Sequence, residues 1–381
     1  MQNGGIHIGA SEPLFDPCSR ARRPDPGLGA KARARSSIRI SRWEPGTDES
    51  WSALVRQVDH ANLAQSPQWF TAIKNAYGHT PVYLKAEDGE GAVALLPAFL
   101  VRSRWFGTVM ASMPFLDGGG PCSASPALAR IVVEALIDEA ARLGAGSVEI
   151  RSNVTIDMPA PAAQDKVNLV MQLPGDPGTL WQKLNAKVRN QVRKAERSGL
   201  SVEFGGAEKL GEFYDIFAVH MRDLGSPVHA QGFFRAVLEA FGDEARVALV
   251  RIGTAPVGGL IALAFKRTLV VPWASSLREY FPLCANVLLY WETIRFACQK
   301  GFRRFDFGRS SRNSGTYHFK RQWGALEEPL YCYTIPIAHS DYKRWSSVDS
   351  RGASSLVRLW KHLPVGFTRW VGPHVRKYLT Q

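Results

Sequence analysis

The sequence predicts a mixed α/β fold built from two related halves, and three observations support this prediction. The 381 residues exceed what one ordinary hydrophobic core holds, so two domains are expected. The composition, 45% hydrophobic against 21% charged, is that of a chain able to bury a sizeable core. A weak internal repeat indicates in addition that the two domains share one architecture.

The repeat joins two segments that each read as amphipathic helix, glycine and strand. The segment from Glu134 to Ser152 resembles the segment from Leu289 to Ser310, and aligning Gly144 with Gly301 gives one gap-free register. A glycine directly after an amphipathic helix is the expected left-handed cap, and the short apolar run after it is a strand. The unit is common in α/β proteins, so similarity by chance is the alternative, but a duplication is favoured.

Composition divides the chain into four parts. Residues 1–37 are rich in Gly, Pro, Ser and Arg and are expected to form a disordered tail. Two domains follow, over residues 38–173 and 174–338, separated by a Pro/Gly-rich linker and with the chemistry expected in the second. Residues 339–381 form a basic aromatic tail. The first domain is expected to contain a helix and two strands, at Trp51–Val58, Pro81–Lys85 and Ala92–Val101.

The net charge of +13 and the sequence pI near 9.7 favour polyanionic partners such as RNA, nucleotide-linked sugars or acidic membrane surfaces. A solvated cationic surface without a partner is the alternative. Five scattered cysteines without a CxxC pair, and nine histidines without metal spacing, predict neither disulfides nor a metal and fit a reducing cytoplasm. No signal peptide or membrane-spanning run is found, so a cytoplasmic protein is expected.

The C-terminal tail combines cations with tryptophans. Residues 341–381 hold eight Lys or Arg against two Asp, with Trp345, Trp360 and Trp370 among them. This pattern fits peripheral contact with the inner membrane surface. A helix that packs its aromatic residues on the protein body is the alternative, and Pro364 interrupts any long helix.

The segment from Thr179 to Gly199 is a strongly cationic helix candidate. Thr179 and Gln182 match a capping box, and an apolar stripe from Trp181 to Ala195 is expected to pack inward. The polar face then carries cations that can converge on phosphate, although such a face is often only solvated. The candidate phosphate-binding residues here are Lys187, Arg189, Asn190 and Arg193.

The most informative stretch runs from Phe305 to Gly324, FDFGRSSRNSGTYHFKRQWG. Alternation in a strand points Asp306 away from the flanking phenylalanines. Gly308 is expected to end this strand and expose Arg309, which places an acid and a cation at the usual ligand edge of an α/β sheet. A structural salt bridge made by Asp306 is the alternative.

A lysine in the same stretch is the candidate catalytic group. Tyr317, Phe319 and Trp323 are expected to anchor Lys320 on a partly buried scaffold and to help line the substrate site. Such a cation can stabilise the oxyanion that forms when an amine attacks an ester or thioester carbonyl. No GxSxG elbow or Cys/His pairing marks a covalent mechanism, so direct transfer is expected, with Asp306 as the second catalytic candidate.

With these motifs, the sequence resembles the FemAB family of tandem N-acetyltransferase-fold (GNAT) aminoacyl or acyl transferases. It resembles most the branch associated with exosortase and PEP-CTERM exopolysaccharide systems. The resemblance covers about residues 38–337 and lies in five motifs. They are SMPFLDGGGP at Ser112–Pro121, KxRNxxRKAExxG at Lys187–Gly199, MRDLGSPV at Met221–Val228, and FDFGRSS and FKRQWG in the stretch above.

The resemblance implies transfer of an aminoacyl group from aminoacyl-tRNA to a nucleotide- or lipid-linked cell-wall precursor, with no permanently bound cofactor. The family's Phe-Lys pair matches Phe319 and Lys320, and its phosphate-binding cations correspond to the segment of Lys187. The chain lacks the coiled-coil arm of the peptidoglycan enzymes, which argues against tRNA as the donor carrier. A polysaccharide precursor is the expected acceptor.

Two alternatives remain open from the sequence. One is a CoA- or carrier-protein-dependent N-acyltransferase, although Arg104–Val109 departs from the acetyl-CoA loop in having Val109 where a small residue is expected. The other is a non-catalytic component that binds an anionic polymer or membrane.

Overall fold

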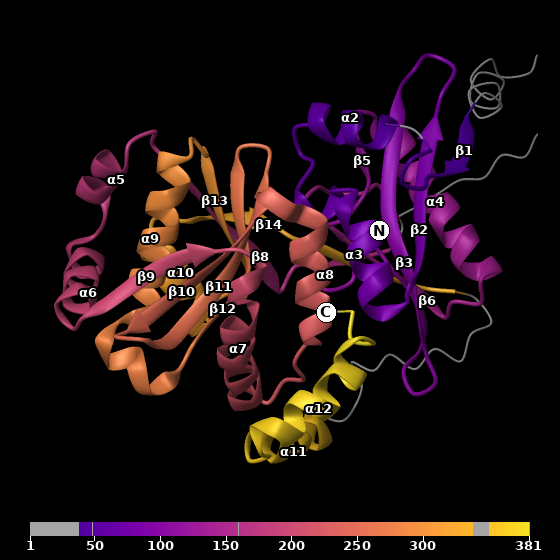
Figure 1. Ribbon diagram of the computed structural model, residues 1–381. Helices are drawn as coiled ribbons and strands as arrows, with labels where there is room; N and C mark the ends of the chain where they lie inside the picture. Colours follow the sequence, from indigo (N-terminus) through magenta and orange to yellow (C-terminus); the bar gives the residue numbers. More distant parts are fainter. Residues whose placement is uncertain (1–37, 48, 159, 338–349, 381) are drawn as a thin grey trace, which may run out of the picture. The chain divides into compact units, whose positions relative to one another are not determined.

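Figure 1 shows the computed structural model, which describes residues 38–47, 49–158, 160–337 and 350–380. Residues 39–381 form one compact unit. The tail expected over residues 1–37 lies outside the described residues, as does the beginning of the C-terminal tail.

The first sheet has eight strands in the order β1-β2-β3-β4-β6-β15-β7, with β5 paired to β3. Its strands are β1 (Arg39–Arg42), β2 (Thr80–Glu87), β3 (Val93–Ser103), β4 (Gly107–Ala111), β5 (Cys122–Ser123), β6 (Ser147–Ser152), β7 (Ala162–Ala163) and β15 (Tyr331–Pro336). The helices of this half are α2 (Ser50–Gln57), η1 (Leu63–Gln65), α3 (Gln68–Tyr77) and α4 (Pro126–Arg142). The predicted helix and two strands of this half are confirmed as α2, β2 and β3.

The second sheet has seven strands in the order β14-β8-β13-β12-β11-β10-β9. Its strands are β8 (Lys166–Gln172), β9 (Leu200–Gly205), β10 (Ala245–Ile252), β11 (Ala255–Phe265), β12 (Thr268–Ser276), β13 (Arg304–Ser311) and β14 (Leu326–Pro329). The helices of this half are α5 (Pro177–Lys183), α6 (Ala186–Arg197), η2 (Ala207–Lys209), α7 (Leu210–Leu224), α8 (Gln231–Phe241), η3 (Gly242–Glu244), η4 (Arg278–Leu283), α9 (Ala285–Gln299) and α10 (Gly315–Arg321). Two C-terminal helices follow, α11 (Ser350–Lys361) and α12 (Val365–Arg376).

The internal repeat is visible in the fold. Gly144 and Gly301 have φ angles of 75° and 79° and end the helical segments that precede β6 and β13. Each sheet contains one parallel pair, β4 with β6 and β12 with β13, and each pair is hydrogen-bonded over only three residues before the strands separate. The mixed α/β fold with two related halves is therefore confirmed, and each half opens between its parallel strands.

The two sheets exchange strands across the domain boundary predicted between residues 173 and 174. Strand β8 precedes the linker but lies in the second sheet between β13 and β14, whereas β15 follows β14 in sequence and pairs with β6 in the first sheet. Sheet membership therefore does not follow the order of the chain, and the division into domains 38–173 and 174–338 stays a prediction.

The prediction of one cationic helix from Thr179 to Gly199 is wrong. The chain forms two helices, α5 and α6, because the side chain of Asn185 accepts a hydrogen bond from the Lys187 backbone N–H at 2.8 Å and starts a new helix. The cap of α5 is Asp176 instead of Thr179. The apolar stripe is confirmed, since Val188 and the residues in phase with it are buried.

One hydrophobic cluster spans both halves. Helix α3 of the first half packs against α8 of the second, with Trp69 against Phe241 at a ring-centroid distance of 4.9 Å. Trp273 of β12 also contacts Trp69, at 6.4 Å. Burial of large aromatic side chains supplies much of the packing energy of such a contact. The two halves are thus held against each other by an apolar joint, and a polar cavity lies beside it.

Candidate functional site

A cavity of about 380 Å³ lies where the second sheet opens, a volume typical of small-molecule sites. Trp273 and Val270 of β12 line it together with β13, where the parallel pairing has ended. The first half contributes loop residues, and α12 contributes one arginine. Polar and charged side chains around it include Asp117, Asn168, Asp306, Arg309, Lys320 and Arg376.

The strand that carries the acid has the predicted alternation. Phe305 and Phe307 are buried in the core of the second half, whereas Asp306 between them lines the cavity. The sequence predicts that the strand ends at Gly308, and this is wrong. The strand continues to Ser311 after a shift in its pairing with β8. Gly308 has a φ of 72°, a left-handed conformation that glycine adopts without strain and that accommodates this irregularity.

Asp306 is a partly buried carboxyl with two hydrogen bonds. Its Oδ1 accepts from the Gly308 backbone N–H at 2.7 Å, and its Oδ2 accepts from the Asn168 side-chain amide at 2.8 Å. Burial raises the pKa of Asp306 to about 6, against the opposing effect of these two bonds. The group therefore titrates close to neutral pH, as a general base does.

Lys320 is brought to the cavity by the short helix α10, whose cap is the side chain of Ser314. The lysine is only 8% exposed, and its ammonium donates hydrogen bonds to the carbonyl oxygens of Gly308 at 2.9 Å and Arg309 at 2.8 Å. Burial lowers its pKa to about 8, while nearby Asp117 and Asp306 act in the opposite direction. The structure thus places Lys320, Asp306 and Arg309 around one cavity, as the sequence predicts.

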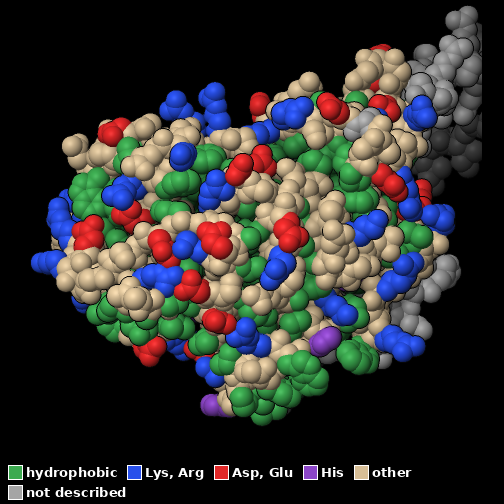
Figure 2. All heavy atoms as spheres, in the orientation of Figure 1, with side chains coloured by type: hydrophobic (Ala, Val, Ile, Leu, Met, Phe, Trp, Pro, Cys, Tyr) green, Lys and Arg blue, Asp and Glu red, His purple; other side chains and the backbone are tan. Residues whose placement is uncertain are grey.

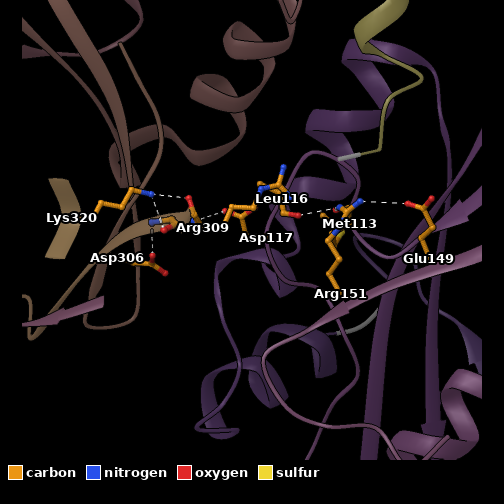
Figure 3. Close-up of polar contacts among 9 residues, drawn as sticks. Met113, Leu116, Asp117, Glu149, Arg151, Asp306, Arg309 and Lys320 are labelled. Atoms are coloured by element: carbon orange, nitrogen blue, oxygen red, sulfur yellow. Dashed lines mark hydrogen bonds and ion pairs between the residues drawn. The ribbon is translucent and has the colours of Figure 1, made fainter. Parts of the chain in front are cut away.

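Arg309 is held by a residue of the first half. Its Nε forms an ion pair with Oδ1 of Asp117 at 2.9 Å, and its backbone N–H donates to Oδ2 of the same carboxylate at 3.1 Å. Figure 3 shows this contact as the middle of a series of polar contacts that begins at Lys320. The cavity wall is therefore built from both halves of the chain.

The loop that carries Asp117 is held in place by hydrogen bonds from Arg151. The buried side chain of Arg151 donates to the carbonyl oxygens of Leu116 at 3.1 Å and Met113 at 3.4 Å and lies 3.5 Å from Glu149 (Figure 3). In this loop, Met113 and Phe115 have φ angles of 51° and 74°, which is costly for residues with a side chain and persists only where the surroundings enforce it. The hydrogen bonds from Arg151 therefore fix the position of Asp117.

The equivalent opening in the first half is filled by the chain itself. Glu149, which the register of the repeat (Gly144 with Gly301) aligns with Asp306, accepts a hydrogen bond from the Thr380 hydroxyl at 2.6 Å. The backbone N–H of Phe115 donates to the Thr380 carbonyl at 3.1 Å, and Thr380 is buried. The C-terminal residues therefore occupy the first opening, whereas the second contributes to the cavity.

The predicted phosphate-binding residues of α6 do not line this cavity. Arg189 donates to the carbonyl oxygens of Leu184 at 2.8 Å and Gln182 at 3.0 Å, which satisfies the end of α5. The guanidinium of Arg193 lies 5.6 Å from the Trp181 ring. Lys187 and Asn190 are both exposed. The structure keeps these four residues together on one helix but apart from Asp306 and Lys320.

The three aromatic residues predicted around Lys320 lie in or directly after α10, the helix that carries Lys320, and do not line the cavity. Phe319 packs on Tyr290 at 5.1 Å and on Trp323 at 6.3 Å, and Trp323 is buried. The Tyr317 hydroxyl donates to Glu327 at 2.5 Å on the surface. Their expected role as anchors fits this packing, while a role in binding substrate stays a prediction.

Several cavity residues are not identified by the sequence. Asp117 lies in the SMPFLDGGGP motif, which is part of the family resemblance but predicts no role for this residue. His229 directly follows the MRDLGSPV motif. The Nε of Arg376 donates to Nε2 of His229 at 3.0 Å, so this nitrogen carries no proton and the ring is neutral. Burial lowers the pKa of both groups, that of Arg376 to about 10. Asn168 and Arg376 stand in no motif.

Two features of the described residues bear on other classes of site. Among those residues, no group of three His, Cys, Asp or Glu side chains is arranged to hold a metal ion. None of the described helices combines the length and apolar character required to cross a bilayer.

Residues 182–321 match the family described as Acetyltransferase (GNAT) domain. This range contains β13 and Lys320 but not β8. No curated protein matches the sequence.

Three solved structures are similar over most of their length. FemX has a TM-score of 0.59 at 13% identity, covering 78% of this chain and 97% of its own. The C-terminal domain of a putative lysylphosphatidylglycerol synthetase from Agrobacterium fabrum has a TM-score of 0.52 at 11% identity, covering 81% and 94%. A tandem GNAT protein from the clavulanic acid biosynthesis pathway has a TM-score of 0.52 at 11% identity, covering 80% and 100%. The chain therefore has the fold of two tandem GNAT-like domains.

Proposed function

We propose that this protein is a FemAB-like transferase that moves an aminoacyl or acyl group onto an amine or hydroxyl of a cell-envelope glycan or peptidoglycan precursor. The observation that carries the proposal is Lys320, a buried ammonium fixed by the carbonyl oxygens of Gly308 and Arg309 at the edge of the cavity. The tandem GNAT fold, shared with FemX and with the lysylphosphatidylglycerol synthetase domain, supports the reaction class.

Lys320 would stabilise the transition state of direct transfer. An ammonium has three N–H donors, so the two bonds to backbone carbonyls leave a third for the carbonyl oxygen of the donor substrate. When the acceptor nucleophile attacks this carbonyl carbon, negative charge develops on the oxygen, and a fixed cation in a buried site stabilises it strongly. The ester or thioester bond then breaks and the tetrahedral intermediate collapses to product.

Asp306 would receive the proton that the attacking group loses. With a pKa of about 6 it is largely ionised at pH 7, and it lines the same cavity as Lys320. The proton then passes to the leaving oxygen or sulfur, which balances the reaction without a covalent enzyme intermediate. Arg309, held by Asp117, would hold a phosphate or carboxylate of the acceptor.

The donor that best fits the proposal is aminoacyl-tRNA, with a carrier-protein thioester or acyl-CoA as the second candidate. The basic face of α6 would then contact phosphate outside the cavity, through Lys187 above all. The match to an acetyltransferase domain favours the thioester candidate. The proposed acceptor is a nucleotide- or lipid-linked precursor of an exopolysaccharide system of the PEP-CTERM type, as the family resemblance implies.

Transfer assays with two donors test the proposal. Purified protein receives either a mixture of tRNAs charged with ¹⁴C-labelled amino acids or ¹⁴C-acetyl-CoA, together with a butanol extract of cell-envelope precursors as acceptor. We expect label from charged tRNA in the extract, and its loss in Lys320→Ala but not in Lys300→Ala, which removes an exposed lysine of the same half. Label from acetyl-CoA alone would select the thioester candidate.

Two outcomes would contradict the proposal. Equal transfer by Lys320→Ala and wild type would remove Lys320 from the mechanism. Absence of transfer with either donor, combined with salt-sensitive binding of the glycan precursors, would favour a non-catalytic binding protein.

A further inference from the structure

The helices α11 and α12 expose an unusual number of large apolar side chains. Leu356, Leu359 and Trp370 are 61%, 60% and 69% exposed, and Val357 and Phe367 are exposed as well. Figure 2 shows hydrophobic side chains gathered at the lower end of this face, where Figure 1 draws the two helices. A concentration of exposed apolar side chains of this kind marks a contact surface more often than an isolated exposed leucine does.

The charge of this segment is of one sign. Residues 350–381 contain six Lys or Arg and no Asp or Glu. One of the cations, Arg369, pairs with Asp215 of α7 at 2.6 Å, whereas Lys361 is exposed beside the apolar residues. Cations that flank exposed leucine and tryptophan are the composition of helices that lie in the interface of an anionic membrane.

The two helices are fixed to the body, so their apolar side chains cannot simply fold inward. A Cβ on Gly225, which ends α7 with a φ of 75°, would lie 2.6 Å from Val357 of α11. A Cβ on Gly372 of α12 would lie 3.0 Å from the backbone nitrogen of Val228. Close packing at these two glycines, together with the Arg369 ion pair, holds the outer face of the hairpin in place.

We propose that α11 and α12 form a docking surface for an anionic phospholipid bilayer, on which they lie in the interface plane without crossing it. Leu356, Leu359, Phe367 and Trp370 would enter the boundary between headgroups and acyl chains, and Lys361 would contact lipid phosphate. The commitment to lipid instead of a protein partner rests on the charge, since the described part of this segment carries cations and no acid to match a protein surface of mixed sign.

The same helix connects the proposed surface to the cavity. Trp370 is exposed, and Arg376 six residues later lines the cavity, a separation of about 9 Å along a helix axis. The cavity would therefore lie close to the bilayer surface, where a lipid-linked acceptor is found. Binding to lipid does not require the proposed transfer, so either proposal can fail without the other.

Vesicle flotation tests the surface. The full chain is mixed with vesicles of phosphatidylcholine alone, or with vesicles in which about 30% of the phosphatidylcholine is replaced by the anionic lipid phosphatidylglycerol. We expect flotation with the anionic vesicles, weakened by salt, and at least about tenfold weaker binding for Leu359→Ser combined with Trp370→Ser, since each buried side chain of this size contributes about a factor of ten.

Matched variants separate lipid binding from loss of folding. Leu326→Ser removes a leucine that is also 60% exposed but lies on β14, and it is expected to float like the wild type. Lys361→Glu is expected to weaken binding only to anionic vesicles. Failure of the wild type to float, or equal flotation of wild type and the double variant, overturns the proposal. A dimer that the double variant converts to a monomer, without flotation of either, would assign the surface to a second copy of the chain.

Discussion

Asp117 and Arg309 lie 192 residues apart in the sequence, and the single carboxylate of Asp117 contacts both the side chain and the backbone N–H of Arg309. The carbonyl of Arg309 in turn accepts a hydrogen bond from the Lys320 ammonium. A loop of the first half therefore positions the backbone that fixes the candidate catalytic lysine of the second. Asp117 acts in this scheme as a positioning residue.

Replacing Asp117 by Ala should lower the pKa of Lys320 below about 8, because Asp117 is the strongest of the groups that keep this ammonium charged. The alkaline limb of the pH–rate profile should move to lower pH, together with a loss of turnover of about tenfold or more. Asp157→Ala, which removes an exposed carboxylate that pairs with Arg130, is the control. An alkaline limb that stays in place would show that Asp117 supports structure alone.

The wild-type enzyme should show a bell-shaped profile of kcat/KM. Activity requires ionised Asp306, so it falls as the pH drops through about 6, and it requires protonated Lys320, so it falls as the pH rises through about 8. The residual activity of Asp306→Asn should lack the acidic limb and keep the alkaline one. The pH profile is measured at a saturating donor concentration in buffers of constant ionic strength. If the acidic limb persists in Asp306→Asn, the ionisation near pH 6 belongs to another group.

Asp306→Asn should be more stable than the wild type at pH 7.5. The folded-state pKa lies above the ordinary 3.8, so the folded protein binds the proton more tightly, and the stability that this contributes is present below about pH 4 and lost as the pH rises through 6. The full difference corresponds to about 3 kcal/mol. Loss of the attraction to Lys320 reduces the expected gain to roughly 1–2 kcal/mol.

The amide can be accommodated because Oδ1 of Asn168 is buried and has no hydrogen-bond partner among the described residues, so this side chain can turn and accept from the new amide. Urea unfolding at pH 5.0 and 7.5 measures the gain, which should shrink at the lower pH. Asp243→Asn, at a fully exposed aspartate, serves as the reference. A variant that is less stable than the wild type at both pH values would contradict the pKa assignment.

Two substitutions in α6 should affect different properties, one the stability and the other the binding of tRNA. Arg189→Ala removes the donor that satisfies the carbonyl oxygens at the end of α5, so it should lower the free energy of unfolding by about 1–2 kcal/mol. Lys187→Ala should leave stability unchanged and, if the helix contacts phosphate, weaken filter binding of tRNA. Unchanged tRNA binding in Lys187→Ala would leave α6 with a structural role.

The sequence predicts the parts of this site that depend on local patterns. Alternation places Asp306 opposite Phe305 and Phe307, and the aromatic spacing around Lys320 predicts its anchored position. The repeat predicts the two tandem halves, since a glycine cap followed by a strand recurs at equal spacing. Each of these predictions rests on patterns within short continuous segments of the sequence.

What the sequence could not give depends on contacts between distant segments. Asp117 approaches Arg309 only because the two halves pack through α3 and α8, and Asn168 reaches Asp306 only because β8 joins the second sheet. The break between α5 and α6 had a local cause in Asn185, but the apolar stripe continues through it, so periodicity alone predicts one helix.

The exchange of β8 and β15 between the two sheets limits how the chain can be divided. A fragment that starts at the linker would lack β8, leaving β13 with an open edge and Asp306 without the amide of Asn168. It would also carry β15 without the sheet to which this strand belongs. Neither half is a portable module, so shuffling, truncation or separate expression of the halves would break both sheets at once.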